Sequence, residues 1–360
     1  MRQCALSWPA NALHALLSPL PHESPQTLET QGKPPFVQGL QLGHRKRLLE
    51  LLRLVPGTGE TRMTGDEPTE QIETLILNGA FEPDQVAVDV AGGEAVARCQ
   101  KDPGKETENE DTTAIIPYGP GAAVLVVADG AGGLPAGKRA SLTAVTTLAT
   151  ALQTAMDKTM LLRTAILNGI EAANDAVLAL ANGSATTMTV ITIEGLVARS
   201  YQIGDSEALV VGQRGLIKLQ TTAHSPTGFA VEAGFLDERD ALHHEDRHLV
   251  SNFLGTSDMR IDVGAGVELR PRDTVLVASD GLTDNIHLDE IVECIRTGGL
   301  AESVAELLTL ANRRMAGPSG GQPSKPDDLS LILFRKPGSA RIIRESKHSA
   351  GTQGPVRVPS

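Results

Sequence analysis

The stretch Val124-Leu-Val-Val-Ala-Asp129-Gly130 carries an unbroken apolar run into an aspartate and a glycine. With the two alanines before it, the run Ala122 to Ala128 predicts a buried β-strand, and it is far too short to span a bilayer. Apolar residues also lead into an aspartate and a small residue at Tyr201–Ser206 and Val275–Gly281. One aspartate at a strand end is usually a turn or cap residue. Its repetition suggests that several strand ends contribute to one acidic site.

Acidic residues mark five predicted strand boundaries: Asp129, Asp205, Asp280, the pair Asp327-Asp328 before LSLILF, and Asn109-Glu110-Asp111 before TTAII. Gathering unpaired carboxylates is costly unless a cation compensates them. Hard oxygen ligands without flanking histidine or cysteine favour Mg²⁺ or Mn²⁺ over zinc. Two such ions that share a carboxylate would activate a water molecule and hold a phosphoryl group. The spacing favours such a site but is compatible with other functions.

The remaining pattern predicts the order strand, two helices, several strands, two helices and a last strand. Such an order is typical of an α+β protein rather than of regular βαβ winding. A strand or hairpin is expected over 85–99. The two Ala-rich helices are expected at 137–156 and 159–181, the short strands at 187–193, 196–203, 207–212 and 216–219, a strand at 274–279, helices at 287–296 and 300–315, and a final strand at 328–335.

The two ends of the chain lack this periodicity. Five prolines stand within residues 18–35, which is typical of a linker, and one short amphipathic helix is expected at Arg45 to Leu54. Gly, Ser, Arg and Pro dominate after Lys336. We therefore expect residues 1–84 to form a flexible N-terminal extension with one or two short helices, that at Arg45 to Leu54 among them. Residues 85–336 should form one domain, and residues 337–360 a disordered tail.

Composition excludes several classes of protein. The 360 residues are 41% hydrophobic, which is enough for a globular core, and 44 acidic against 32 basic residues give a net charge of −12. An acidic chain without a basic stripe is not expected to bind nucleic acid, and no apolar run is long enough for a membrane partner. Three scattered cysteines form no CxxC pair, which favours a reduced, cytoplasmic protein.

A second motif overlaps the first acidic position. Gly132-Gly-Leu-Pro-Ala-Gly137-Lys138 matches the GxxxxGK pattern of a phosphate-binding loop, between a predicted strand and a predicted helix. The next residue is Arg139, whereas this loop requires Ser or Thr there to hold Mg²⁺. A P-loop NTPase is therefore the weaker alternative, and it predicts ATP binding that depends on Lys138.

Six motifs in order resemble those of the metal-dependent protein phosphatases, the protein phosphatase 2C family in its bacterial form. The resemblance covers roughly residues 85–336, and it is specific because of the order of the motifs rather than any one of them. The motifs are Asn109-Glu-Asp111, Asp129-Gly-Ala-Gly-Gly133, Thr186-Thr187, Gly204-Asp-Ser206, Ser279-Asp-Gly-Leu282 and Asp327-Asp-Leu-Ser330.

The resemblance implies a fold and an activity. The fold would be an α-β-β-α sandwich of two antiparallel β-sheets flanked by helices. The activity would be that of a Mn²⁺- or Mg²⁺-dependent serine/threonine protein phosphatase, which acts on phosphorylated proteins and opposes a kinase. A metal-bridging water would attack the phosphorus in line, so no covalent intermediate on Ser, Cys or His is expected.

The resemblance also implies metal ligands and a number of ions, two or three. Asp129 would bridge two metals, and the carbonyl of Gly130 would bind one of them. Asp280 and Asp327 would complete one shell, Glu110 and Asp111 would hold the other ion partly through water, and Asp205 would join Asp280 at a third ion.

Two departures from the family pattern concern the substrate. Glu106 stands where relatives have an arginine that grips the substrate phosphate, and Lys105 beside it is the expected replacement. A lysine offers a point charge but not the bidentate fork of arginine. Ala131 and Leu134 stand where some relatives have a histidine, so the leaving-group acid is not identified, and a metal-bound water is an alternative.

These departures leave a non-catalytic alternative open. The missing arginine would suit a regulatory binding module that has kept the fold and lost turnover. Retention of Asp129, Asp280 and Asp327 favours the enzyme, because costly carboxylates would be the first residues to drift in an inactive relative.

Overall fold

The computed structural model describes residues 73–79, 85–131, 136–317 and 320–338. The chain divides into two units, and all the described residues belong to the second, Thr69–Ser360. The amphipathic helix expected at Arg45 to Leu54 and the tail from residue 339 onward lie outside the described residues.

Two antiparallel sheets form the centre of this unit. The first sheet runs in the order β1-β4-β5-β7-β8-β11, with β6 paired to β5 and β12 to β8. Its strands are β1 (Leu75–Leu77), β4 (Asp111–Pro117), β5 (Ala122–Ala131), β6 (Ala185–Thr186), β7 (Met188–Glu194), β8 (Val197–Ile203), β11 (Asp262–Val263) and β12 (Val267–Glu268). The second sheet, in the order β10-β9-β13-β14-β3-β2, contains β2 (Val86–Val90), β3 (Gly93–Gln100), β9 (Glu207–Val211), β10 (Ile217–Gln220), β13 (Thr274–Ala278) and β14 (Leu329–Arg335).

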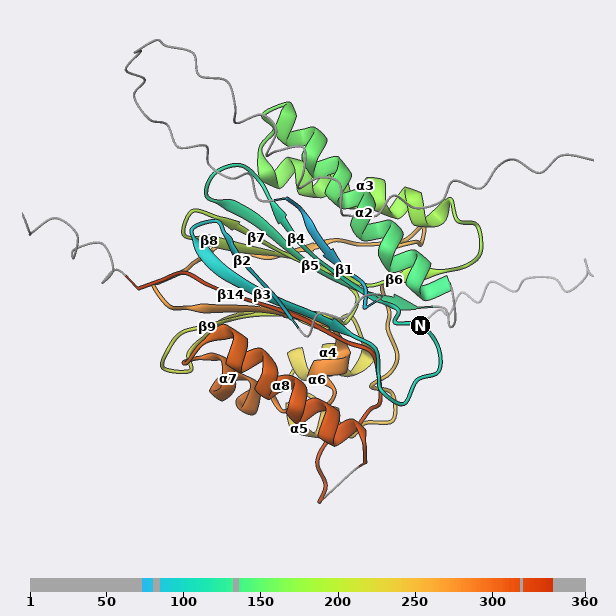
Figure 1. Ribbon diagram of the computed structural model, residues 1–360. Coiled ribbons are helices and arrows are strands. Elements are labelled where there is room, and N and C mark those ends of the chain that lie inside the picture. Colours follow the sequence, from blue (N-terminus) through green and yellow to red (C-terminus); the bar gives the residue numbers. More distant parts are fainter. Residues whose placement is uncertain (1–72, 80–84, 132–135, 318–319, 339–360) are drawn as a thin grey trace, which may run out of the picture. The chain divides into compact units, whose positions relative to one another are not determined.

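Helices cover the outer face of each sheet, so the four layers are arranged α-β-β-α (Figure 1). The first sheet is covered by α2 (Ala136–Asp157) and α3 (Leu162–Leu178), and the second by α6 (Asp280–Thr283), α7 (Leu288–Ile295) and α8 (Leu300–Met315). Two short helices, α4 (Pro226–Glu232) and α5 (Glu238–Ala241), lie between β10 and β11. No helix among the described residues combines the length and apolar character needed to cross a membrane. The predicted fold is confirmed.

The strand β5 shows why its sequence is apolar without interruption. Val124 and Val126 pack into the core between the first sheet and its helices. Leu125 and Val127 point the other way, into the core between the two sheets. A strand that is buried on both faces requires apolar residues at every position rather than at alternate ones.

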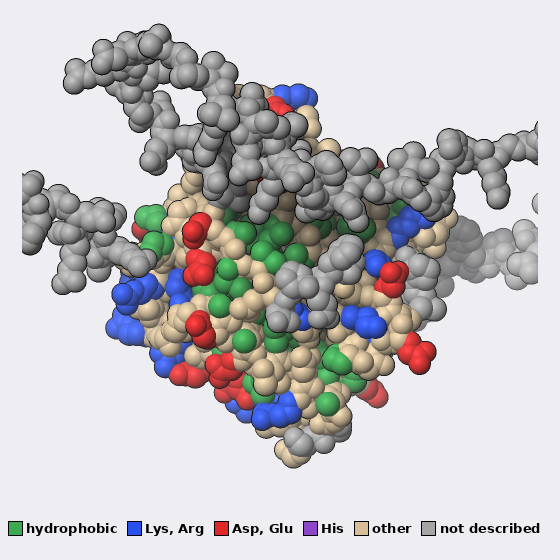
Figure 2. Space-filling view, in the orientation of Figure 1, with side chains coloured by type: hydrophobic (Ala, Val, Ile, Leu, Met, Phe, Trp, Pro, Cys, Tyr) green, Lys and Arg blue, Asp and Glu red, His purple; other side chains and the backbone are tan. Residues whose placement is uncertain are grey.

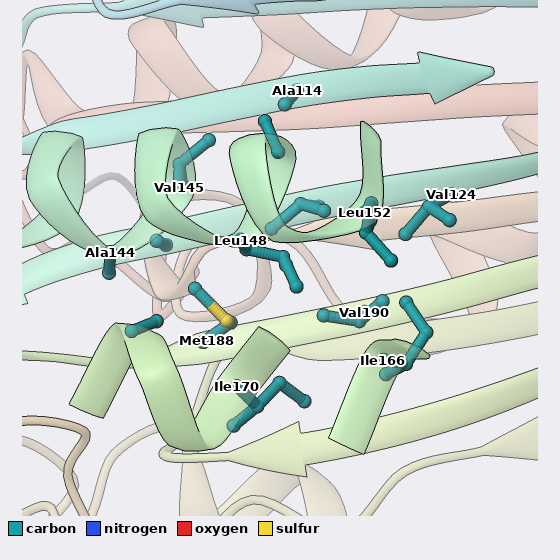
Figure 3. Packing of buried hydrophobic residues seen from close by; sticks show 14 of the residues in the cluster. Ala114, Val124, Ala144, Val145, Leu148, Leu152, Ile166, Ile170, Met188 and Val190 are labelled. Carbon is teal, nitrogen blue, oxygen red and sulfur yellow. The ribbon is translucent and has the colours of Figure 1, made fainter. Parts of the chain in front are cut away.

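Small residues allow α2 and α3 to pack closely on the first sheet. Leu148 of α2 and Ile170 of α3 share one buried cluster with Met188 of β7 (Figure 3). A Cβ atom at Gly169 would lie 2.7 Å from Leu148 Cδ1, so a larger residue there would require the Leu148 side chain to shift. This packing compensates for the scarcity of aromatic residues, which make up 2% of the chain.

The strand β1 lies before residue 85, where the sequence predicts that the domain begins. Leu75, Ile76 and Leu77 pair with Ile115, Ala114 and Thr113 of β4, so the first sheet includes residues from the expected extension. A strand of three residues is too short to show alternation in the sequence. Only its pairing with β4, some forty residues later, identifies it as part of the sheet.

Candidate metal centre

The acidic residues singled out in the sequence lie at corresponding strand ends of the two sheets. β4 begins at Asp111, β5 ends shortly after Asp129, and the antiparallel ladder places these two residues directly opposite each other. Asp205 follows β8, Asp280 follows β13, and Asp327 precedes β14. Because paired strands alternate in direction, these positions share one edge within each sheet. Like charges directly opposite each other on paired strands are destabilising unless something compensates them.

Acids from both sheets lie close enough to raise one another's pKa values, so they form one cluster. Burial raises the pKa of Asp129 well above its ordinary value, and the charges of Asp111, Asp280, Asp327 and Asp205 raise it further. Burial, followed by the charge of Asp280, raises the pKa of Asp205. The same two causes raise the pKa of Asp327 to about 7. Such a cluster carries more negative charge than the protein alone neutralises, which suits divalent cations.

Three carboxylates of the cluster each have one oxygen held and the other without a partner. Asp111 Oδ2 accepts a hydrogen bond from Ser279 Oγ at 2.8 Å, and Glu110 Oε2 lies 2.7 Å from the ammonium of Lys105. Asp111 Oδ1, Glu110 Oε1 and Asp280 Oδ1 are buried and have no hydrogen-bond partner among the described residues. A buried carboxylate oxygen that accepts no hydrogen bond is costly. These three oxygens are therefore suited to bind hard cations.

Lys105 lies within this cluster and already has two acidic partners. Its Nζ is 2.7 Å from both Glu110 Oε2 and Asp328 Oδ2. Burial opposes the charged form, but hydrogen bonds to Asp328 and Glu110 outweigh it and raise the pKa of Lys105 above its ordinary value. The side chain is 23% exposed. The residue expected to replace the missing arginine is thus a permanent cation beside a proposed metal ligand.

Backbone hydrogen bonds from the Thr186-Thr187 motif hold Asp129 in place. The N–H of Thr187 donates to Asp129 O at 2.8 Å, and the N–H of Asp129 donates to Thr187 Oγ1 at 2.9 Å. Thr186 Oγ1 also donates to Asp129 O, at 2.8 Å. The sequence motif therefore positions the central aspartate through its main chain.

Glycines permit the close backbone approaches on either side of the cluster. The N–H of Gly130 donates to Glu110 O at 3.2 Å, and a Cβ atom at Gly130 would overlap the carbonyl group of Gly137. A Cβ atom at Gly281 would likewise overlap Asp328 O. Any side chain at Gly130 or Gly281 would push apart the segments that carry the acids.

Buried His224 supports the turn that carries Asp205. The N–H of Gly204 donates to His224 Nδ1 at 3.1 Å, and Asp262 Oδ2 lies 3.1 Å from His224 Nε2. Gly204 itself has a φ of +98°, in the left-handed region that favours glycine. The Gly204-Asp-Ser206 motif therefore forms a turn whose conformation depends on Gly204 and on its hydrogen bond to His224. This turn positions Asp205.

A cleft of about 340 Å³ opens beside the cluster, between the second sheet and the helices α4 and α5. Asp205, Asp280 and Asp284 of the cluster are among the residues that line it, as are Thr227 and Arg247.

Two charged residues of the centre were not identified from the sequence. Asp284 is four residues after Asp280, a spacing that places both on one face of α6, so a helix predicted after Ser279 would have revealed it. Lys325 comes from the loop before β14, and its Nζ lies 3.0 Å from Asp284 Oδ2. No local pattern indicates that position.

The described residues contain no preformed group of three or more acidic, histidine or cysteine ligands that could hold a metal ion. Lys105 and Lys325 lie among the acids.

The geometry does not support the P-loop alternative. Lys138 lies in the first turn of α2, and its Nζ is 2.7 Å from Glu108 Oε1. The carboxylate of Glu108 is 69% exposed, so this is a surface ion pair.

Comparison with known proteins identifies the family. A model of the protein phosphatase 2C family matches residues 103–313, more than half of the chain. The chain belongs to the protein phosphatase 2C family. This segment contains every acidic motif described above except Asp327-Asp328.

Individual relatives agree with this assignment. Protein phosphatase PhpP of Streptococcus pneumoniae is 30% identical over 216 residues, which are 58% of this chain and 87% of that protein. The crystal structure of the Mycobacterium tuberculosis serine/threonine phosphatase PstP/Ppp is 26% identical, with a TM-score of 0.55, over 68% of this chain and 98% of that one. A structure of the PstP catalytic domain in complex with two manganese ions is also 26% identical, with a TM-score of 0.53, over 67% and 96% of the two chains.

The protein is therefore a metal-dependent serine/threonine protein phosphatase. The predicted family, activity and divalent metal cofactor, Mn²⁺ or Mg²⁺, are confirmed. Neither the P-loop NTPase nor the non-catalytic module is favoured, because the relatives are named as phosphatases. The assignment of individual residues is not settled by family membership and is argued below.

Proposed function

We propose that this phosphatase hydrolyses phosphoserine and phosphothreonine of protein substrates at the acidic end of its two sheets. The observation that carries the proposal is that three carboxylates there have a buried oxygen without a hydrogen-bond partner. Glu110, Asp111 and Asp280 each keep one buried oxygen that has no hydrogen-bond partner among the described residues. Buried acceptors of this kind are what hard divalent cations require.

The acids of the cluster divide into two groups that could each hold an ion. The two ions, when bound, supply an activated water and offset the negative charge that develops on the transferred phosphoryl group. The proposed ligands are Asp129, which would be shared by the two ions, and the carbonyl of Gly130 on one of them. Asp280 and Asp327 would serve one ion, Glu110 and Asp111 the other, and Asp205 lies at the margin next to the cleft.

Residues of the chain perform the remaining tasks. Ser279 fixes one oxygen of Asp111 and leaves the other for a ligand. Lys105 brings a partly exposed ammonium to the edge of the centre, where it can attract a substrate phosphate.

Burial, followed by the charge of Asp111, raises the pKa of Cys99 to about 12. Burial is also the largest cause that raises the pKa of Cys294 to about 12. Neither thiol is therefore a nucleophile at neutral pH.

The direct test is a metal-dependent assay on the purified chain. We expect hydrolysis of a phosphothreonine peptide with Mn²⁺, loss of the activity with excess EDTA and recovery when Mn²⁺ is added back. A phosphotyrosine peptide of the same sequence serves as the comparison and should be the poorer substrate. Absence of turnover at saturating Mn²⁺ would contradict the proposal. Calorimetric Mn²⁺ binding without turnover would instead identify a non-catalytic module.

Replacement of Lys105 by Met should lower kcat/KM for the phosphopeptide about 10- to 100-fold, because hydrogen bonds to charged groups contribute about 1.5–3 kcal/mol. The change should raise KM and also weaken product inhibition by inorganic phosphate. Lys138→Met is the matched control, since Lys138 pairs with an exposed glutamate, and it should leave both constants unchanged. If Lys105→Met weakened only Mn²⁺ binding, Lys105 would merely position Glu110.

Residue boundaries, partners and location extend the proposal. The catalytic domain runs from β1 to Lys336, and the residues before and after it are extensions. An opposing Ser/Thr kinase follows from the reaction, which reverses phosphorylation. On the face shown in Figure 2, Lys and Arg are interspersed with Asp and Glu, so this face carries no uniformly basic surface of the kind that binds nucleic acid. A cytoplasmic location is supported by Cys99 and Cys294, which are free thiols.

A further inference from the structure

Lys325 inserts its ammonium among three carboxylates of the metal centre. Its Nζ pairs with Asp280 Oδ2 and lies 3.0 Å from Asp284 Oδ2 and 3.4 Å from Asp327 Oδ2. The side chain is 19% exposed. Burial opposes its charged form, but the charges of Asp280, Asp284 and Asp327 outweigh this and raise the pKa of Lys325 above its ordinary value. Three carboxylates therefore surround an ammonium that is positively charged at neutral pH, as lysine ordinarily is.

The main chain of Lys325 is fixed by a buried asparagine. The N–H of Lys325 donates to Asn285 Oδ1 at 2.8 Å, and Asn285 Nδ2 donates to Lys325 O at 2.8 Å. Asn285 is fully buried, and its Nδ2 also donates to Gly281 O at 2.9 Å. Arg314 Nη1 holds the carbonyl of Asn285 at 2.7 Å. The lysine thus extends from a rigid support that belongs to the same segment as Asp280.

Asp280 can serve Lys325 and a divalent ion at the same time. Its Oδ2 pairs with Lys325, and its Oδ1 is buried without a hydrogen-bond partner in the described part of the chain. Likewise, Lys105 pairs with Glu110 Oε2, and Glu110 Oε1 has no hydrogen-bond partner among the described residues. A cation bound to the second oxygen therefore does not need to displace either lysine.

Lys325 occupies the side of the centre that faces the cleft. Asp280 and Asp284, which pair with Lys325, line the cleft there together with Asp205. The sequence left the number of ions at two or three, with Asp205 and Asp280 as the ligands of a third. One resident positive charge, that of Lys325, already pairs with Asp280.

We propose that Lys325 is the resident cation of the side where Asp280 and Asp284 line the cleft, so that this phosphatase takes up two divalent ions and Lys325 stands in for a third. The inference rests on the proposed function, since it assumes that the remaining acids hold two ions. Removing the ammonium leaves Asp280 and Asp284 with an uncompensated charge, and a third ion should then bind there.

The test is the number of manganese ions bound, counted by native mass spectrometry and by calorimetry on the full chain at saturating Mn²⁺. We expect two ions for the wild type and for Lys325→Arg, which keeps the charge. Lys325→Met, which keeps the approximate volume, should bind three. Lys218→Met removes a lysine that pairs with buried Asp273 away from the centre, and it should bind two.

Three ions on the wild type, or two on Lys325→Met, would overturn the inference. A wild type that binds no manganese would overturn the proposed function itself and is distinguishable from both results. Should Lys325→Met not fold, Lys325→Gln makes the same test, because it also removes the charge and retains a polar group for the three acids.

Discussion

Replacing Asp129 by Asn is expected to reduce phosphatase activity at least about 100-fold, since changes in residues that merely support metal ligands already cost about 10- to 100-fold. The same change should make the metal-free protein more stable. Asp129 is repelled by Asp111, Asp205, Asp280 and Asp327, and burial adds to this repulsion in raising its pKa. Asn has nearly the same shape and no charge, so it removes the repulsion and also the proposed shared ligand.

The variant should therefore have lower activity and a higher melting temperature in the metal-free form. A purely structural role of Asp129 would not produce this combination. A gain of about 1 kcal/mol raises the melting temperature of a domain of this size by about 2–4 °C, and the metal-free variant should show at least that. Asp89→Asn, at an exposed position of β2, is the control and should change neither quantity. Retained activity, or a lower melting temperature in EDTA, would show that Asp129 is not the centre of the cluster.

Elements with strong local patterns could be predicted from the sequence. β5, α2, α3, α8 and β14 lie within a few residues of their predicted bounds, because apolar periodicity and length are local properties. The elements between residues 220 and 270 could not be predicted. α4, α5, β11 and β12 are two to seven residues long, too short for a period, and the last two exist only through pairing with β8.

The candidate site divides in the same way. The acids expected from the motifs, such as Asp129 and Asp280, come together because strand direction fixes where each strand ends. Lys325 could not be found, since its place depends on the buried Asn285 forty residues earlier in the chain. Local sequence thus identifies which residues are chemically capable, whereas tertiary packing decides which cations accompany them.

The stability that Mn²⁺ confers is expected to increase with pH. Burial and neighbouring charges raise the pKa of Asp327 to about 7 and that of Asp284 to about 6, from 3.8. A carboxyl group whose pKa is higher in the folded state stabilises that state fully below about pH 4, and this contribution is lost as the pH rises through 6 to 7. The metal-free protein should therefore lose stability between pH 5.5 and about pH 8, whereas bound Mn²⁺ requires the ionised acids.

Melting temperatures measured in EDTA and in Mn²⁺ across this pH range make the test. An ion present at 100 times its dissociation constant contributes about 2.7 kcal/mol, so each ion should raise the melting temperature by about 5–10 °C at pH 8. The shift should shrink towards pH 5.5, because protons then compete for Asp327 and Asp284. Asp327→Asn should flatten the pH dependence in EDTA, since it removes the group that titrates near pH 7. A metal-free protein that gained stability from pH 5.5 to 8 would show that these acids are compensated within the chain, and that the cluster does not depend on divalent ions for its charge balance.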